Sequence, residues 1–168
     1  RRRERGIDTA WTDVFGVLRS PALGLIAGLG LLLLALFAIW LFATNLLYTL
    51  TLGPDAPVSA TAFARDAVTT SAGWTMIAAG IGMGFLFALS TLVIGVVSFP
   101  LLLDRDVGVG TAIQTSFRAV RQNPLPMAAW GLIIAVSLAI GAIPLLVGLA
   151  IVLPILGHAT WHLYRKLV

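Results

Sequence analysis

Two histidines near the C-terminal end have the residue type and spacing best suited to chemistry. His158 and His162 lie four residues apart, so on a helix they share one face, and this spacing can hold a metal ion or haem iron. A closed zinc site needs two further ligands, and the chain contains no cysteine. The alternative is an interfacial pair that hydrogen-bonds lipid headgroups, water or a neighbouring loop. We favour this second interpretation and expect no metal and no cofactor, but a bound phospholipid.

Asp104 and Asp106, on either side of Arg105, are the other residues whose types suit acid/base chemistry. Two carboxylates so close in sequence form an acid/base pair only inside a pocket. We expect one of them instead to cap the helix that follows and to pair with Arg118 or Arg121. The sequence therefore predicts no catalytic residue, and a protein that is not an enzyme.

The composition indicates the kind of fold that must position these residues. Of the 168 residues, 59% are hydrophobic and only 11% are charged, against about 25% charged residues in a soluble domain. So few polar groups could not cover the surface of a water-soluble globule, and we predict an integral membrane protein. The net charge of +4 would also suit nucleic acid, but the positions of the charges explain it through membrane topology. No nucleic-acid partner is expected.

Long stretches without charged residues define the expected spans, because a spanning helix needs about 20 apolar residues. The charge-free stretches are 20–54, 67–103 and 122–164. The last one holds two spans, since Gly141 followed by Pro144 places a helix-stop residue before a helix-start residue. The predicted spans are 21–48, 72–98, 126–140 and 145–164. Pro154 should kink the fourth.

The predicted fold is all-α: a polytopic membrane protein with four transmembrane helices in two hairpins, each hairpin preceded by a cytoplasmic amphipathic surface helix. With four spans, the N-terminus, the 102–124 segment and the C-terminus share one side. That side holds every Lys and Arg except Arg65, so both termini should be cytoplasmic. In the loop on the other side, residues 59–68 predict a short helix capped by Ser59.

Two segments outside the spans resemble each other and indicate an internal repeat. Residues 9–19 and 111–121 each end in Arg and lead through polar residues and a proline into a span. Each places apolar side chains at i, i+4 and i+7: Trp11, Phe15 and Leu18 in the first, and Ile113, Phe117 and Val120 in the second. We predict a parallel repeat of 7–101 and 108–167 within a single membrane domain of residues 1–168. The alternative is a chance similarity between two interfacial helices.

These surface helices and the C-terminal end supply the expected contacts with the membrane interface. Aromatic side chains would enter the interface, and basic side chains would reach the headgroups. The predicted contact residues are Trp11, Phe15, Arg19, Phe117, Arg118, Arg121, Arg165 and Lys166.

Glycines with small-xxx-small spacing are the predicted helix-packing or partner-docking positions. They are Gly24 and Gly28 in the first span and Gly80 and Gly84 in the second. Inside the fold they would let two spans approach closely; on the lipid face they would dock another subunit. The spans hold no charged residue, whereas a transporter or proton carrier normally places ionisable residues at mid-membrane. This argues against an ion-coupled transporter and an intramembrane protease.

Three parts of the sequence carry a family resemblance. They are the segment 99–108 (Phe-Pro-Leu-Leu-Leu-Asp-Arg-Asp-Val-Gly), the residues Ala112, Ser116, Phe117, Val120, Asn123 and Pro124, and the segment 157–166. The chain, from about Trp11 onward, resembles an uncharacterised family of bacterial integral membrane proteins, some of whose members are labelled as cytochrome c oxidase subunits. The resemblance implies a multi-pass protein of the inner membrane that accompanies respiratory complexes. It supplies no catalytic residues.

We therefore expect a non-catalytic accessory, assembly or bridging subunit of a larger membrane protein complex, in the first place a respiratory terminal oxidase or supercomplex of the bacterial inner (cytoplasmic) membrane. The alternatives are an independent small transporter-like or lipid-handling protein and an accessory subunit of a photosynthetic complex. The chain begins at Arg1 and not at Met, and we expect further sequence before it.

Overall fold

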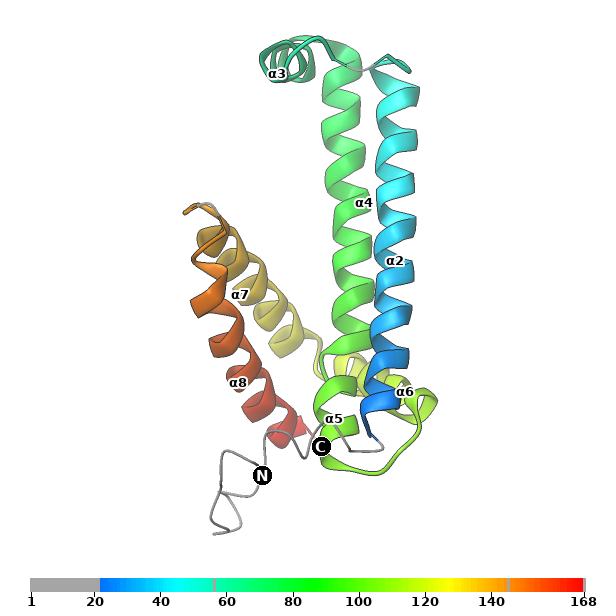
Figure 1. The fold of residues 1–168 in the computed structure, drawn as a ribbon, viewed down its shortest axis with the longest axis vertical. Helices are drawn as coiled ribbons and strands as arrows, with labels where there is room; N and C mark the ends of the chain where they lie inside the picture. Colours follow the sequence, from blue (N-terminus) through cyan, green and yellow to red (C-terminus); the bar gives the residue numbers. More distant parts are fainter. Residues whose placement is uncertain (1–21, 56, 145, 168) are drawn as a thin grey trace. The chain divides into compact units, whose positions relative to one another are not determined.

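The computed structural model describes residues 22–55, 57–144 and 146–167, and in this part of the chain helices joined by short turns and loops are the regular secondary structure, without a strand (Figure 1). The helices are α2 (Ala22–Thr51), α3 (Ala60–Thr69), α4 (Ser71–Gly95), α5 (Ser98–Asp104), α6 (Val109–Gln122), α7 (Pro124–Ala142) and α8 (Leu149–Leu167). The all-α prediction is confirmed for these residues. The surface helix predicted at 9–19 lies outside them, so the repeat stays a prediction.

Three segments of the described chain are long and apolar enough to cross a membrane. They are Leu23–Thr51, Ser71–Asp104 and Pro124–Ala142. Each overlaps a predicted span, but α7 starts two residues earlier than expected because Pro124 occupies the start of the helix after Asn123. The predicted fourth span corresponds to α8, which does not begin until Leu149 and whose second half is polar.

Contacts divide the chain into two compact units, which we describe separately. Unit 2 is residues 32–91, and unit 1 combines 22–31 with 92–167 of the described residues.

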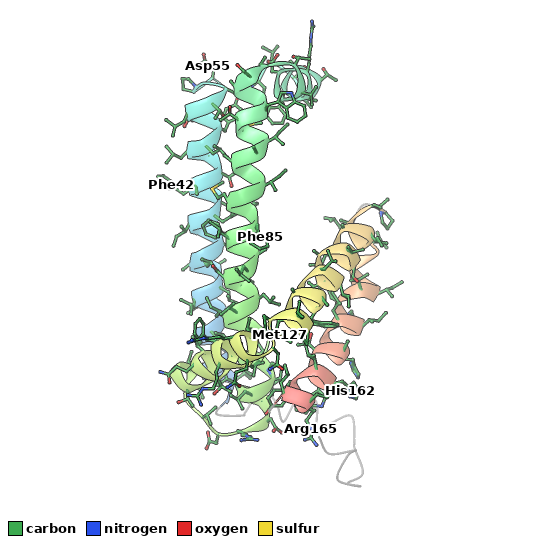
Figure 2. The ribbon with its side chains drawn as sticks, turned by 180° about the vertical axis from the view of Figure 1, so that it is seen from behind. Phe42, Asp55, Phe85, Met127, His162 and Arg165 are labelled. Carbon is green, nitrogen blue, oxygen red and sulfur yellow. The ribbon has the colours of Figure 1, made fainter. Side chains whose placement is uncertain are left out.

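Unit 2 is a helical hairpin in which α2 and α4 run antiparallel and side by side (Figure 1). Both helices are apolar all round, as expected of segments whose solvent is lipid. Gly80 is where the two helices come close, since a Cβ there would lie 3.7 Å from a methyl group of Leu47. Phe42 and Phe85, labelled in Figure 2, are both more than 60% exposed. The hairpin thus keeps large apolar side chains such as these two on its outer surface.

Helix α3 closes the hairpin and confirms the short helix predicted at 59–68. Ser59 is its N-cap, and its hydroxyl accepts a hydrogen bond from the Ala62 N–H at 3.1 Å. Tyr48 connects the end of α2 to this loop: its hydroxyl donates to the Asp55 carbonyl at 2.7 Å, and its ring lies 6.2 Å from that of Phe63. These contacts link the end of α2 to the loop and to α3.

Helices α3 and α4 meet in a close backbone contact at Gly73. A Cβ at this position would lie 2.4 Å from the carbonyl oxygens of Asp66 and Ala67. The Thr70 hydroxyl donates to the Asp66 carbonyl and accepts from the Gly73 N–H, so it links the end of α3 to the start of α4. Only a residue without a side chain fits between the two helices here.

In unit 1, α7 and α8 form a second, shorter antiparallel hairpin (Figure 1). The helices meet at two glycines: a Cβ on Gly148 would lie 2.7 Å from the Gly141 carbonyl oxygen. Leu146 in the turn has a φ of 68°, a left-handed conformation that costs an ordinary residue roughly 1–2 kcal/mol. The connection between the two helices is longer than the turn predicted at 141–144, since α7 ends at Ala142 and α8 begins only at Leu149, after the left-handed Leu146.

We predict that Gly73→Ala destabilises the protein by about 1–3 kcal/mol, because its methyl group collides with backbone that cannot move aside. Gly82→Ala is the matched control on the same helix, since nothing lies within 4 Å of a Cβ there. The control should keep or slightly raise the stability through the better helix propensity of alanine. Equilibrium unfolding of both variants in a mild detergent tests this, and equal stabilities would contradict the close contact.

Candidate functional site

A small buried core in unit 1 brings together five helices and positions the polar groups around it. Its members are Leu29 of α2, Val96 and Val97 between α4 and α5, Leu101 and Leu102 of α5, Ala112 and Ala119 of α6, Met127 of α7 and Tyr164 of α8. We call this set the unit 1 core. It is the one place in the described chain where so many helices share buried side chains.

The predicted second span, 72–98, ends three residues beyond the observed end of α4, but the sequence gives no sign that the chain continues into another helix inside this core. Helix α4 ends at Gly95 and α5 starts at Ser98. At the break, the fully buried Ser116 of α6 donates its hydroxyl to the Val93 carbonyl at 2.6 Å and accepts from the Val97 N–H at 3.2 Å. In an unbroken helix these two backbone groups would bond each other. The hydroxyl thus takes the place of one backbone hydrogen bond of the helix and links α6 to the break.

Helix α6 uses two different faces. Its buried residues are Ala112, Ser116 and Ala119, all small and spaced i, i+4 and i+7, which lets the helix approach the α4–α5 break closely. Ile113 and Val120, from the apolar stripe predicted by the sequence, only flank the core, and Phe117 of the same stripe is 53% exposed. The face that contacts the protein is therefore the small-residue face, and Phe117 is left free to contact lipid.

Tyr164 fixes the C-terminal end of α8 to the end of α5. Its side chain is 2% exposed, its ring lies 5.5 Å from that of Trp161, and its hydroxyl donates to Asp104 Oδ2 at 3.0 Å. The expected capping role of an acidic residue on α6 is wrong: the N-cap is Gly108, and no side chain bonds there. Asp104 is the last residue of α5, and from there it faces Tyr164.

A polar pocket of about 230 Å³ opens beside this hydrogen bond. It is lined by Asp104, Arg105, Tyr164 and Arg165, so two guanidinium groups and one carboxylate surround it. Both arginines are exposed, and Figure 2 labels Arg165 at the end of α8. We call this site the Arg105–Arg165 pocket. Its chemistry is that of anion binding through guanidinium groups, next to a carboxylate that is already engaged by a tyrosine.

The four glycines predicted for packing or docking do not behave alike. Gly80 faces Leu47 within unit 2, whereas no atom of residues 22–55, 57–144 or 146–167 lies within 4 Å of a Cβ on Gly24, Gly28 or Gly84. Gly80 therefore serves packing inside the chain. The other three leave open surface on their helices.

The predicted interface residues fall into two groups. Trp11, Phe15 and Arg19 lie outside the described residues. The others are all exposed and lie on α6 or at the end of α8: Phe117, Arg118, Arg121, Arg165 and Lys166. Of these, Arg165 alone also lines the Arg105–Arg165 pocket.

The histidine pair lies on one exposed face of α8, as the spacing predicted. His158 and His162 are both exposed, and Figure 2 labels His162 near the polar end of the helix. Within the ranges that the structure describes, no group of three or more His, Asp or Glu side chains comes together as a metal site would require.

Sequence reasoning missed the residues that hold the site together. Ser116 and its two alanine neighbours form a small-residue stripe that could have been read from the i, i+4, i+7 spacing. The hydrogen bond between Tyr164 and Asp104 joins residues 60 positions apart, and no local sequence pattern predicts it.

One protein family, described as "Predicted integral membrane protein (DUF2189)", has a profile that matches residues 1–104, which is more than half of the chain. The matched range includes α2, α3, α4 and α5 and ends at Asp104. No curated protein and no solved structure matches the sequence significantly.

We predict that Ser116→Ala costs about 1–3 kcal/mol of folding free energy, because it leaves the part-buried Val93 carbonyl and the buried Val97 N–H without this partner. Thr115→Ala is the matched control, since the Thr115 hydroxyl donates to the Thr111 carbonyl within α6 and is not buried. That change should stay within about 0.5 kcal/mol. Equilibrium unfolding measures both, and a Ser116→Ala variant as stable as the control would show that the inserted hydroxyl does not hold the break.

Proposed function

The chain belongs to the DUF2189 family of predicted integral membrane proteins, and we propose that it acts as a non-catalytic subunit that docks onto a larger membrane protein complex. The observation that carries this proposal is the outer surface of the spans. In the most apolar window of α2, only 6% of the residues are buried within the chain. Gly24 and Gly28 of this helix also present backbone with nothing beside it. Small residues on an open helix face permit close contact with another helix.

The distribution of charge supports a docking role over a catalytic or transport role. The helices α2, α4 and α7 contain no Asp, Glu, Lys or Arg. Proton relays and ion pathways place such residues within the membrane, where their cost is tolerated only for function. Helices that carry none suit a subunit whose work is contact with protein and lipid.

The first partner to test is a respiratory terminal oxidase or supercomplex of a bacterial inner membrane, acting with this chain as accessory, assembly or bridging subunit. This choice rests on the resemblance of segments 99–108 and 157–166 to a family of membrane proteins, some of whose members are labelled as oxidase subunits. The docking role itself stands on the open span surface and is independent of that partner.

We also propose four spans with both termini in the cytoplasm. Helices α7 and α8 each have 19 residues, about 28 Å at 1.5 Å per residue, close to the thickness of the hydrocarbon core. They are antiparallel, and Tyr164 near the end of α8 shares the unit 1 core with Met127 near the start of α7. If α7 crosses the membrane, this contact requires α8 to return to the side where α7 began. Arg165 and Lys166 at that end favour the cytoplasm.

Cysteine accessibility tests this topology, because the chain has no cysteine of its own. Single-cysteine variants at the exposed positions Val58, Gln122 and Lys166 would be labelled with a membrane-impermeant maleimide before and after opening of the cells. We expect Gln122→Cys and Lys166→Cys to react only in opened cells, and Val58→Cys in intact ones. With three spans, Lys166→Cys would instead react on the side opposite to Gln122→Cys.

Native affinity purification in a mild detergent tests the docking role. We expect the chain to recover a larger complex in fixed stoichiometry, with the absorption spectrum of bound haem if the partner is an oxidase. Deletion of the chain should leave the chemical activity of that complex intact, since a docking subunit contributes no reacting group. Recovery of the chain alone would overturn the proposed role, and recovery of a complex without haem would overturn only the choice of partner.

A further inference from the structure

We propose that the Arg105–Arg165 pocket binds the phosphate group of an anionic glycerophospholipid. The pocket is a distinct site from the open span surface, and this assignment does not depend on which complex the chain joins. Its walls come from the ends of two helices, α5 and α8, that the unit 1 core holds together.

The charges of the lining favour a phosphate. Arg105 and Arg165 present two planar guanidinium groups, each of which can donate two parallel hydrogen bonds to phosphate oxygens. The lining has two positive groups against the single carboxylate of Asp104, so an anion is attracted. Asp104 accepts the Tyr164 hydroxyl at Oδ2, which orients one of its oxygens toward the tyrosine. A volume of about 230 Å³ accommodates a phosphate with the start of its glycerol group.

The surroundings favour a lipid as the source of that phosphate. Leu103, directly before Asp104, is 49% exposed, and the first half of α8 carries the exposed side chains Ile151, Leu153 and Ile155. These three lie about 15–21 Å along α8 from Arg165, at 1.5 Å per residue. Acyl chains extending from a headgroup held at the helix ends could run along this apolar surface. The ends of membrane helices with clustered basic residues are where anionic headgroups bind.

The position of the pocket in the fold explains how it stays preformed. Tyr164 is anchored in the unit 1 core, and its neighbour Arg165 is exposed, so the buried ring fixes the backbone from which the guanidinium group extends. Arg105 follows the last residue of α5, and its N–H donates to the Leu101 carbonyl at 2.8 Å. Both arginines therefore start from ordered backbone, which lowers the entropy cost of binding.

Lipid binding to the purified full chain tests this proposal. Native mass spectrometry in a mild detergent would measure the affinity for phosphatidylglycerol and, as the zwitterionic comparison, for phosphatidylcholine. We expect Arg105→Gln and Arg165→Gln each to weaken phosphatidylglycerol binding roughly fivefold. Arg65→Gln removes the same charge from an exposed position of α3, far in sequence from the pocket and outside the predicted interface residues, and should change it less than twofold. Equal losses in all three variants would mean diffuse surface attraction and would overturn the pocket.

Two further measurements distinguish the remaining outcomes. Competition by inorganic phosphate and by glycerol phosphate tests the source: if either binds as tightly as phosphatidylglycerol, the site holds free phosphate and the lipid assignment is wrong. Photo-crosslinking of the wild-type chain with a headgroup-labelled phosphatidylglycerol requires no variant. We expect the label at 103–106 and 162–166, and label confined to other segments would overturn the proposal even if a variant failed to fold.

Discussion

The arrangement of unit 1 depends on one inserted hydroxyl group. Where Ser116 separates the Val93 carbonyl from the Val97 N–H, the helix that would otherwise continue as a straight rod ends, and α5 begins. The break places Leu101 and Leu102 in the unit 1 core and Asp104 beside Tyr164. A serine is suited to this position because its hydroxyl can donate and accept at once. As long as the break persists, loss of the hydroxyl would leave the part-buried Val93 carbonyl and the buried Val97 N–H without this partner, in surroundings that offer little water.

Small residues govern the other close contacts, for a reason that belongs to membranes. Apolar surface gains little by leaving lipid for protein, so helices associate through close packing and hydrogen bonds. Gly73 lets α3 and α4 touch through their backbones, and Gly141 with Gly148 does the same for the α7–α8 hairpin. Ala112 and Ala119 flank Ser116 and bring α6 close enough for its hydroxyl to reach the break. The larger side chains, such as Phe42, stay on the outer surface.

Features governed by local composition could be predicted from the sequence. The apolar stretches located α2, α4 and α7, and the serine at 59 located the start of α3, since spanning length and capping are set by neighbouring residues. The break after Gly95 was missed because the residue that causes it lies on another helix. For the same reason the sequence predicts that Asp104 or Asp106 caps α6, the next helix along the chain, whereas the observed partner of Asp104 is Tyr164, 60 positions away on α8.

Helix α8 has a low hydropathy, although the proposed topology makes it the fourth span. The mean hydropathy of α8 is lowered by five polar or charged residues near its C-terminal end: His158, Thr160, His162, Arg165 and Lys166. For this reason α8 is not among the helices that are apolar enough to be selected as membrane spans. One of these residues, Arg165, lines the Arg105–Arg165 pocket together with Tyr164. Tyr164 suits a helix end that is both packed and polar, because its ring is buried in the core while its hydroxyl bonds a carboxylate. In the proposed four-span topology this end of α8 would lie at the headgroups, where a helix is expected to be less apolar than in its membrane-spanning part, so the weak hydropathy of α8 and its basic end would have one physical cause.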